Sequence, residues 1–450
     1  MNEFKQVFTN PPQDWRKQRL GDFLDRVDTR NVVGDQNVLT ISAEHGLISQ
    51  EEFFSRRVAS ENIAGYYRLV AGDFAYNKSY SRGYPMGAIR RLNRYPSGVV
   101  SPLYICFRPS ASAPVVSDFL AHYFDGGAID TQLADVAKEG ARNHGLLNVS
   151  VKEFFEIETA LPPVEEQRCV AQILDTLDTA IRETEALIDK LKAVKQGLLH
   201  DLLTRGIDAN GQLRPPQSEA PQLYKESPLG WIPREWDASQ LCMLTKLITS
   251  GSRGWAAYYA ESGALFLRSQ NVRMGYLDLT DRQLVKPPTG GEGERTKLES
   301  SDLLITITGN GVGNVAHVPD EWAETAFVSQ HVGLVRFNDP QLALLAAHHF
   351  VEGAPGNQQI VSAQYGQSKP GLSLENLRGF WIPVPAKGET SVINSKIACA
   401  YERLAQEEGL AHQLRSLKLG LMDDLLTGRV RVTPLLESMQ QAAASTGCLI

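Results

Sequence analysis

Two stretches of the chain place apolar residues at alternating steps of three and four, the spacing of a helix that packs against another helix. Between Pro163 and Thr204 the sequence has no further proline and one glycine, so little interrupts the first helix. We predict that the two helices pair, because a lone apolar stripe would face water; the alternative is burial of each helix in an ordinary domain. The first seam is Val170, Leu174, Leu177, Ile181, Thr184, Ile188, Leu191, Lys195, Leu198 and Leu202, and the second is Ile393, Ile397, Ala400, Leu404, Glu407, Ala411, Leu414, Lys418, Leu421 and Leu425.

The helices belong to a longer internal repeat. LKAVKQGLLHDLLT at 191–204 and LRSLKLGLMDDLLT at 414–427 share eight of fourteen residues at an offset of 223. Near the start of each half the offset is 221, which pairs Trp15 with Trp236. A repeat of this length is too long for a solenoid, so we interpret the chain as a tandem pair of domain-plus-helix modules. Pseudo-two-fold symmetry between the halves would make the helices antiparallel.

The seams contain a lysine at equivalent places, Lys195 and Lys418. Such a residue either fixes the register of the helix pair or extends its ammonium group to solvent, and the sequence leaves both alternatives open.

The two middle regions have the pattern of mixed α/β domains. Runs of β-branched and aromatic residues bounded by Gly, Pro and Asn predict strands, and helical spacing occurs nearby. The predicted strands are Gly98–Phe107, Ser301–Thr308 and Phe327–Phe337, and the predicted helices are Val115–Phe124 and Gln341–Val351. The resulting division is 1–163 first globular domain, 164–208 first helix, 209–226 polar linker, 227–388 second globular domain, 389–428 second helix and 429–450 C-terminal tail.

Composition excludes several classes of protein. The chain has 450 residues, 42% hydrophobic and 22% charged, as expected of an ordinary globular protein with more than one core. No apolar run approaches the roughly 20 residues that span a bilayer, so we expect no membrane partner. The five cysteines are scattered without a CxxC pair, which favours a reducing cytoplasm.

Signals of catalysis are missing from the sequence. There is no P-loop and no HExxH motif, and the GNGVGN of Gly309–Asn314 lacks the third glycine and following helix of a dinucleotide loop. We therefore interpret that motif as a turn between strands. We expect no catalytic residue, no metal site and no cofactor in this chain.

A basic segment interrupts a chain whose net charge is −7. Between Tyr76 and Arg108 there are six lysine or arginine residues and no acidic residue. Because such cations contact phosphates and Arg, Asn and Gln contact base edges, the segment indicates binding to double-stranded DNA; the alternative is a solvated basic face. With similar stretches of the second domain, the DNA-contact candidates are Lys78, Tyr80, Ser81, Arg82, Tyr84, Arg90, Arg91, Arg94, Arg253, Arg268, Gln270, Asn271, Arg273, Gln364, Gln367 and Lys369.

The stretch from Ala160 to Asp208, ALPPVEEQ through LLTRGID, resembles the first repeated helix region of type I restriction–modification specificity (S) subunits. FAYNKSYSRGYPMGAIRRL and GVVSPLYICF are similar to the first target-recognition domain of that family, and GWIPREW with SDLLITITGNGVGN to the second. In the second repeat, PVPAKGETS stands where the first has LPPVEEQ.

The resemblance implies an α+β protein with two mixed α/β target-recognition domains separated by two long antiparallel helices that form a coiled-coil spacer. It implies a noncatalytic subunit that recognises a bipartite DNA target. It also implies that the helices dock two methyltransferase subunits, which in turn recruit motor–nuclease subunits. On this basis the expected partner contacts are Glu165, Gln167, Leu187, Leu199, Leu203 and Leu426. A coiled-coil scaffold whose globular domains bind proteins is the alternative.

Overall fold

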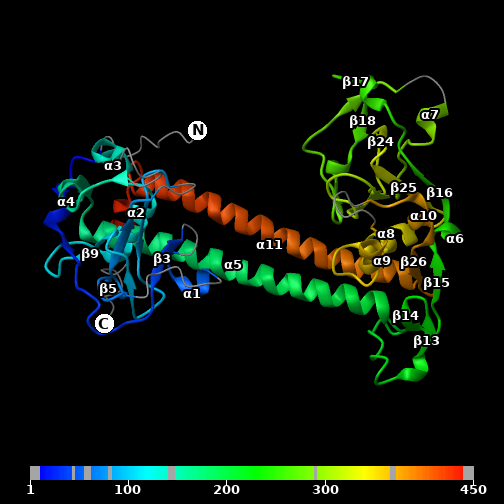
Figure 1. Cartoon of the computed structure of the whole chain (residues 1–450), viewed down its shortest axis with the longest axis horizontal. Coiled ribbons are helices and arrows are strands. Elements are labelled where there is room, and N and C mark those ends of the chain that lie inside the picture. Colours follow the sequence, from blue (N-terminus) through cyan, green and yellow to red (C-terminus); the bar gives the residue numbers. More distant parts are fainter. Residues whose placement is uncertain are drawn as a thin grey trace. The chain divides into compact units, whose positions relative to one another are not determined.

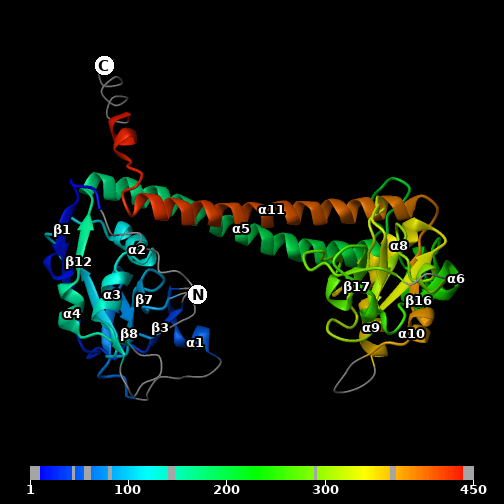
Figure 2. The same cartoon turned by 90° about the horizontal axis from the view of Figure 1, so that it is seen from above.

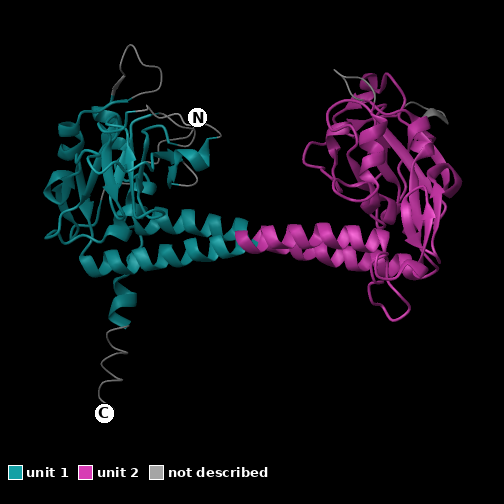
Figure 3. Cartoon of the chain, turned by 60° about the horizontal axis from the view of Figure 1, so that its bottom comes forward, with its two compact units in different colours: residues 1–184, 410–450 teal, residues 185–409 magenta. Residues whose placement is uncertain are grey.

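The structure, a computed structural model, describes residues 11–42, 46–54, 62–79, 84–139, 147–287, 291–364 and 371–438. The chain divides into two compact units (Figure 3). Unit 1 comprises Met1–Thr184 with Leu410–Ile450, and unit 2 comprises Glu185–Gly409. Each unit therefore contains one mixed domain and a part of each of the two long helices.

Unit 1 is built on a four-stranded antiparallel sheet in the order β2-β9-β6-β7. Figure 2 shows α2 beside this sheet and near the beginning of the long helix α5. Aromatic residues from both, including Phe74, Phe107 and Phe119, form the core of the domain. The strands are β1 Arg16–Arg19, β2 Leu24–Arg26, β3 Leu39–Ser42, β4 Gly46–Ser49, β5 Tyr67–Val70, β6 Phe74–Asn77, β7 Ala88–Arg91, β8 Ser97–Val100, β9 Ile105–Pro109, β10 Lys138–Glu139, β11 Leu147–Asn148 and β12 Glu158–Leu161, and the short helices are α1 Gln50–Phe53, α2 Ser117–Asp125, α3 Asp130–Val136 and α4 Val151–Glu156.

Unit 2 has two four-stranded sheets, ordered β16-β25-β22-β23 and β17-β21-β18-β24 (Figure 1). Its first sheet repeats the order of the unit 1 sheet, strand for strand, which gives the sequence repeat a structural counterpart. The strands are β13 Tyr224–Ser227, β14 Gly230–Pro233, β15 Asp237–Gln240, β16 Thr245–Ser250, β17 Tyr259–Ala260, β18 Ala264–Leu267, β19 Val272–Arg273, β20 Tyr276–Leu277, β21 Leu284–Val285, β22 Leu303–Thr306, β23 Val315–His317, β24 Ala326–Val328, β25 Val332–Phe337 and β26 Trp381–Val384, and the short helices are α6 Leu241–Leu244, α7 Gly291–Glu294, α8 Pro340–Phe350, α9 Asn357–Ala363 and α10 Leu374–Gly379.

Two of the strands predicted from the sequence are each two strands. The run 98–107 contains β8 and β9, and the run 327–337 contains β24 and β25. Both turns are short, four residues with one proline in the first and three residues without Gly, Pro or Asn in the second, so the pattern on either side predicts a single strand. The glycine-rich motif at 309–314 lies between β22 and β23, which confirms the predicted turn.

The long helices are α5, Val164–Thr204, and α11, Glu389–Leu425. All twenty seam positions are buried or half-buried. Within unit 1 the Lys418 ammonium lies 2.5 Å from the Asp178 carboxylate, and within unit 2 the Lys195 ammonium lies 4.7 Å from the centre of the Tyr401 ring. These pairs fit antiparallel helices, and each seam lysine has a partner on the opposite helix, which favours a role in fixing register.

Each long helix ends at a glycine that no other residue could replace without strain. Gly206 has φ +60° and lies against Trp236, whereas Gly428 has φ +73° and lies against Trp15. A left-handed backbone favours glycine, and a Cβ atom at Gly206 would approach the Trp236 ring to 2.2 Å. The repeat therefore extends to the way in which each helix stops.

A buried ion-pair network joins the elements at the outer end of the helices in unit 2. One nitrogen of Arg214 lies 2.6 Å from a Glu389 carboxylate oxygen, and another lies 3.1 Å from Glu235. The indole N–H of Trp236 donates to the second oxygen of Glu389 at 2.9 Å. Because Arg214 and Tyr224 are buried in this network and the adjacent core, the segment 209–226 is folded onto the domain and is not the open polar linker that we expected.

Unit 1 contains a similar network, in which an arginine from a different place in the chain meets acids at equivalent positions. Arg431 contacts Glu166 at 2.7 Å and Asp14 at 2.7 Å. Glu166 is the repeat counterpart of Glu389, and Asp14 that of Glu235. The hydrogen bonds that Arg431 donates to Glu166 and Asp14 hold the pKa of its guanidinium above its usual range. The first part of the tail after residue 428 is therefore anchored at Arg431.

We predict that unit 2 depends on the Arg214–Glu389 pair. Arg214→Ala leaves a buried carboxylate without its partner, which costs about 3–5 kcal/mol of folding free energy. The matched control is Lys225→Ala, because Lys225 pairs with Asp237 on the surface and such pairs contribute about 0–1 kcal/mol. Hydrogen exchange of unit 2 amides measures both, and equal losses would contradict the prediction.

Candidate nucleic-acid interface

Most cations of the basic segment 76–108 form ion pairs with acids inside unit 1. Arg90 lies 2.7 Å from Asp125 and donates to the hydroxyl of Tyr84 at 2.7 Å. Arg91 lies 2.6 Å from Asp118, and Arg94 lies 2.9 Å from Glu52. Arg108 lies 2.8 Å from the buried Asp73. The segment has no acid of its own, but the fold supplies one from elsewhere in the chain for each of these four arginines.

This arrangement corrects our interpretation of Arg90 and Arg91 as a DNA-binding cluster. Both side chains are largely buried, at 13% and 14% exposure, and their guanidinium groups connect β7 to helix α2. Arg94 is more exposed, but its charge is also compensated. Four of the six positive charges counted from the sequence are therefore compensated by acids of the fold.

Lys78 and Tyr84 are the other described candidates of unit 1. Lys78 follows the end of β6, and its ammonium donates to the carbonyl of Val149 at 3.2 Å. Burial lowers the pKa of Lys78 and raises the pKa of the Tyr84 hydroxyl. Tyr80, Ser81 and Arg82 lie outside the described residues.

In unit 2 the sheet brings several loops to one end. Strands β16 and β22 end there and strands β25 and β23 begin there, as their antiparallel registers require. The amide of Gly251 donates to the carbonyl of Ser329, and the amide of Ser329 donates to Leu267. Thr308 forms a bridge with Gly371. We call this surface the loop end of unit 2; it consists of residues 251–254, 268–271, 307–314, 329–331 and 364.

The described base-contact candidates of the second domain lie in three stretches, at 253, at 268–273 and at 364. All three stretches reach this loop end, but most of their polar side chains have partners within the fold. Arg268 lies 2.9 Å from Asp281, and Gln270 donates to the same carboxylate at 2.6 Å. These hydrogen bonds lower the pKa of the Asp281 carboxyl. Arg273 lies 3.4 Å from Asp278.

Asn271 is a structural residue. Its side chain is buried, and its amide donates to the carbonyls of Asp278 and Asp281. Gln364 is half-buried and donates to the Val312 carbonyl at 3.5 Å. Gln367 and Lys369 lie outside the described residues. Asn271 is therefore removed from the base-contact candidates.

Arg253 differs from the other named cations. Its side chain is exposed, and within the described ranges it has no ion-pair or hydrogen-bond partner. The loop end also contains polar residues that sequence reasoning missed. The hydroxyl of Thr308 lies 2.6 Å from His331 Nδ1, and Gln330 lies 3.2 Å from His331 Nε2. The predicted strand 327–337 concealed these residues, because the turn between β24 and β25 shows no breaker.

Four of the six expected partner contacts are buried within the chain. Leu199 and Leu203 lie in the main core of unit 2, and Leu426 lies in the core of unit 1. Gln167 is 1% exposed; its amide donates to the Pro162 carbonyl, and its oxygen accepts from the Val116 amide. These four side chains cannot meet a partner in this fold. Glu165 and Leu187 are exposed.

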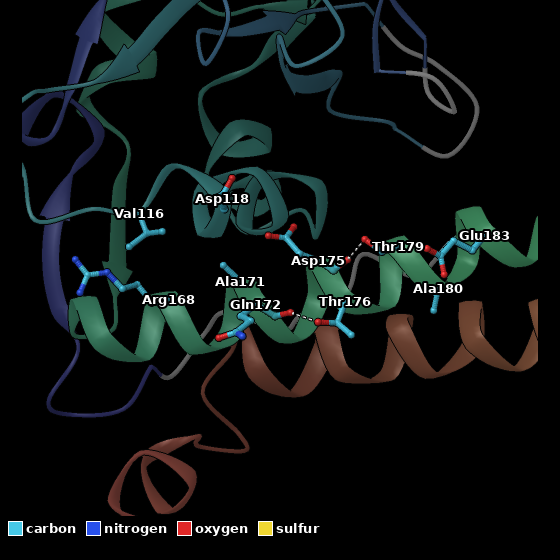
Figure 4. Close-up of a pocket in the computed structure, with 10 residues that line it drawn as sticks. All are labelled: Val116, Asp118, Arg168, Ala171, Gln172, Asp175, Thr176, Thr179, Ala180 and Glu183. Atoms are coloured by element: carbon cyan, nitrogen blue, oxygen red, sulfur yellow. Dashed lines mark hydrogen bonds between the residues drawn. The ribbon is translucent and has the colours of Figure 1, made fainter. Parts of the chain in front are cut away.

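A shallow polar pocket lies in unit 1 between the beginning of α2 and one face of α5 (Figure 4). Its wall on α5 includes Arg168, Gln172, Asp175 and Thr179, which lie along one helix face. Asp175 also accepts from His122 of α2 at 2.8 Å, so this bond ties the domain to the helix.

Within the described residues, one group of side chains is spaced closely enough to hold a metal ion. It consists of His122, Asp175 and Asp178. However, Lys418 already lies 2.5 Å from Asp178 and supplies a positive charge there. One carboxylate of this group, Asp178, is therefore already paired with a cation of the protein.

Several known proteins are similar to this chain in sequence or in fold. No family model matches it. It is similar to the Type I restriction enzyme MjaVIII specificity subunit of Methanocaldococcus jannaschii, with 22% identity over 66% of this chain and 67% of that protein. It is also 22% identical to the putative type I restriction enzyme MjaX specificity subunit of the same organism, over 94% of this chain and 95% of that protein.

Among solved structures, the S subunit of the type I restriction–modification system from M. genitalium shares the fold, with a TM-score of 0.53 and 13% identity, over 93% of this chain and 97% of that one. In sequence and in fold, the chain is similar to type I restriction specificity subunits along nearly its whole length. Its fold class is the expected one, with two mixed domains and two long helices that pack antiparallel within each unit. None of the helices in the described residues is long and apolar enough to cross a membrane.

We predict that the arginines of the basic segment do not set the affinity of this chain for DNA. Each lysine or arginine that neutralises a phosphate contributes about −0.9 to the slope of log affinity against log salt. Arg91→Gln and Arg94→Gln should leave this slope unchanged, because both side chains face acids within the fold. A salt titration of DNA binding measures the slope, and a decrease of about 0.9 per substitution would contradict the prediction.

Proposed function

We propose that the chain recognises a bipartite sequence in double-stranded DNA, with one half-site contacted by each unit. The observation that carries this proposal is a repeated scaffold with different loop-end chemistry. The two units share a sheet order, an Arg–Glu network and an arginine paired with a buried aspartate, Arg108 with Asp73 in one and Arg336 with Asp302 in the other.

The positions at the end of the sheet differ between the units. Where unit 2 has Ser329-Gln330-His331, the repeat offset of 228 places Ser101-Pro102-Leu103 in unit 1. A scaffold that is kept while its polar side chains change supports the reading of two different sequences. The binding of proteins by a coiled-coil scaffold gives no reason for this difference.

We further propose that the helices dock two methyltransferase subunits. In unit 2, Leu187 and Val194 of α5 are 37% and 62% exposed at a spacing of seven residues, which is one face of the helix. In unit 1, Leu410 and Leu417 of α11 are 43% and 50% exposed. Leu410 and Leu417 are the repeat counterparts of Leu187 and Val194, so the chain presents the same apolar pair twice.

Two equivalent pairs suit two copies of one partner. Motor–nuclease subunits would join through the methyltransferase rather than through this chain. The chain itself would act without a cofactor, as a noncatalytic recognition subunit in a reducing cytoplasm. The six-part division at 1–163, 164–208, 209–226, 227–388, 389–428 and 429–450 is kept as a proposal, in which the third part is folded.

Domain exchange tests the DNA-recognition proposal. Residues 15–160 are replaced by the corresponding residues of a related subunit with another target, and the subunit is reconstituted with its methyltransferase. We expect one half of the methylated sequence to change and the other to persist. The matched exchange of residues 238–385 should change the opposite half. If both exchanges leave the methylated sites unchanged, the proposal is wrong.

A second prediction concerns docking. Leu187→Asp with Val194→Asp should remove one methyltransferase copy from the complex, because each places a charge in an apolar contact. Leu410→Asp with Leu417→Asp should remove the other copy, and all four changes together should remove both. Light scattering of the purified complex measures its mass. The exposed Met243→Asp is the control, and retention of two copies in every variant would refute the docking site.

A further inference from the structure

The loop 250–255 in unit 2 is held rigidly. The guanidinium of Arg295 donates to the hydroxyl of Thr249, to the carbonyl of Ser250 and to the hydroxyl of Ser252. Three donors from one side chain therefore fix the backbone that leads into the loop.

The other side of the loop is anchored as well. Gly251 packs so closely on the Ser329 backbone that a Cβ atom there would collide with it, and Gly254 has φ +83°. After the loop, Trp255 is buried, and its ring stacks on Phe266 with centroids 5.6 Å apart. Arg253 is thus the one long side chain at the tip of a loop fixed at both ends.

The Arg253 guanidinium is free within the described residues, and this separates it from the other arginines near the loop end. Arg268 and Arg273 face Asp281 and Asp278, and Arg295 is committed to the loop backbone. Because the loop backbone is already fixed, binding through this guanidinium costs side-chain freedom but little backbone freedom.

We propose that Arg253 reads a guanine in the half-site contacted by unit 2, by donating two hydrogen bonds to O6 and N7 in the major groove. This inference rests on the proposed function. The planar fork of arginine matches the two acceptors on the guanine edge, and such a pair discriminates against the wrong base. A phosphate contact needs only a flexible cation and gives no reason for the fixed loop.

The test uses the complex of the full chain with its methyltransferase and a panel of target duplexes, each with one base pair changed. For the natural chain we expect one G·C position in the second half-site where substitution lowers affinity about 10- to 100-fold. Arg253→Gln should abolish discrimination at that position alone, because glutamine matches adenine rather than guanine. Arg253→Lys should restore part of it.

The matched control is Arg273→Gln. Arg273 is exposed and lies near the loop end, but it is paired with Asp278. This substitution should leave every position of the panel unchanged. Melting temperatures of the variants should equal that of the natural chain, since the Arg253 side chain is exposed. A uniform loss of affinity across the panel in Arg253→Gln, fully restored in Arg253→Lys, would show a phosphate contact and overturn the proposal. Absence of any sequence preference in the natural complex would instead refute the proposed function.

Discussion

The structure depends on burying charge where the helices meet the domains. Arg214 and Arg431 each place a guanidinium among carboxylates that lie far away in the sequence, at Glu389 and at Glu166. A buried charge is tolerated only with a partner in good geometry, so these pairs require the end of one helix to meet the beginning of the other. They fix which parts of the chain join, while the apolar seam supplies the packing along the helices.

The same rule explains what the sequence could and could not predict at the candidate interface. Counting charges along 76–108 finds cations without acids, but Asp118, Asp125 and Glu52 arrive from other elements. Local charge is thus a poor guide wherever long-range ion pairs form. The sequence located the candidate surface of the second domain more accurately, because its three candidate stretches all reach the loop end of unit 2. Arg253 is exposed there.

Periodicity predicted the fold well where one pattern persisted. The helix bounds at 164–204 and 389–425 lie within a few residues of those predicted, since a seam of ten positions averages over single exceptions. The pattern failed at short turns. Residues 329–331 join two strands with three polar residues but no Gly, Pro or Asn, and this concealed Gln330 and His331, which belong to the loop end.

The two units show how one scaffold carries two different surfaces. The repeat keeps residues that have partners inside the fold, such as the buried Asp73 and Asp302 at the base of the sheet, and Lys195 and Lys418 in the seam. A change at Asp73 or Asp302 alone would remove the acidic partner of an arginine. A solvent-facing residue at a loop end can change without leaving a charged group of the protein unpaired. Divergence therefore accumulates at the loop ends, which is where a protein that reads different sequences with each half needs it.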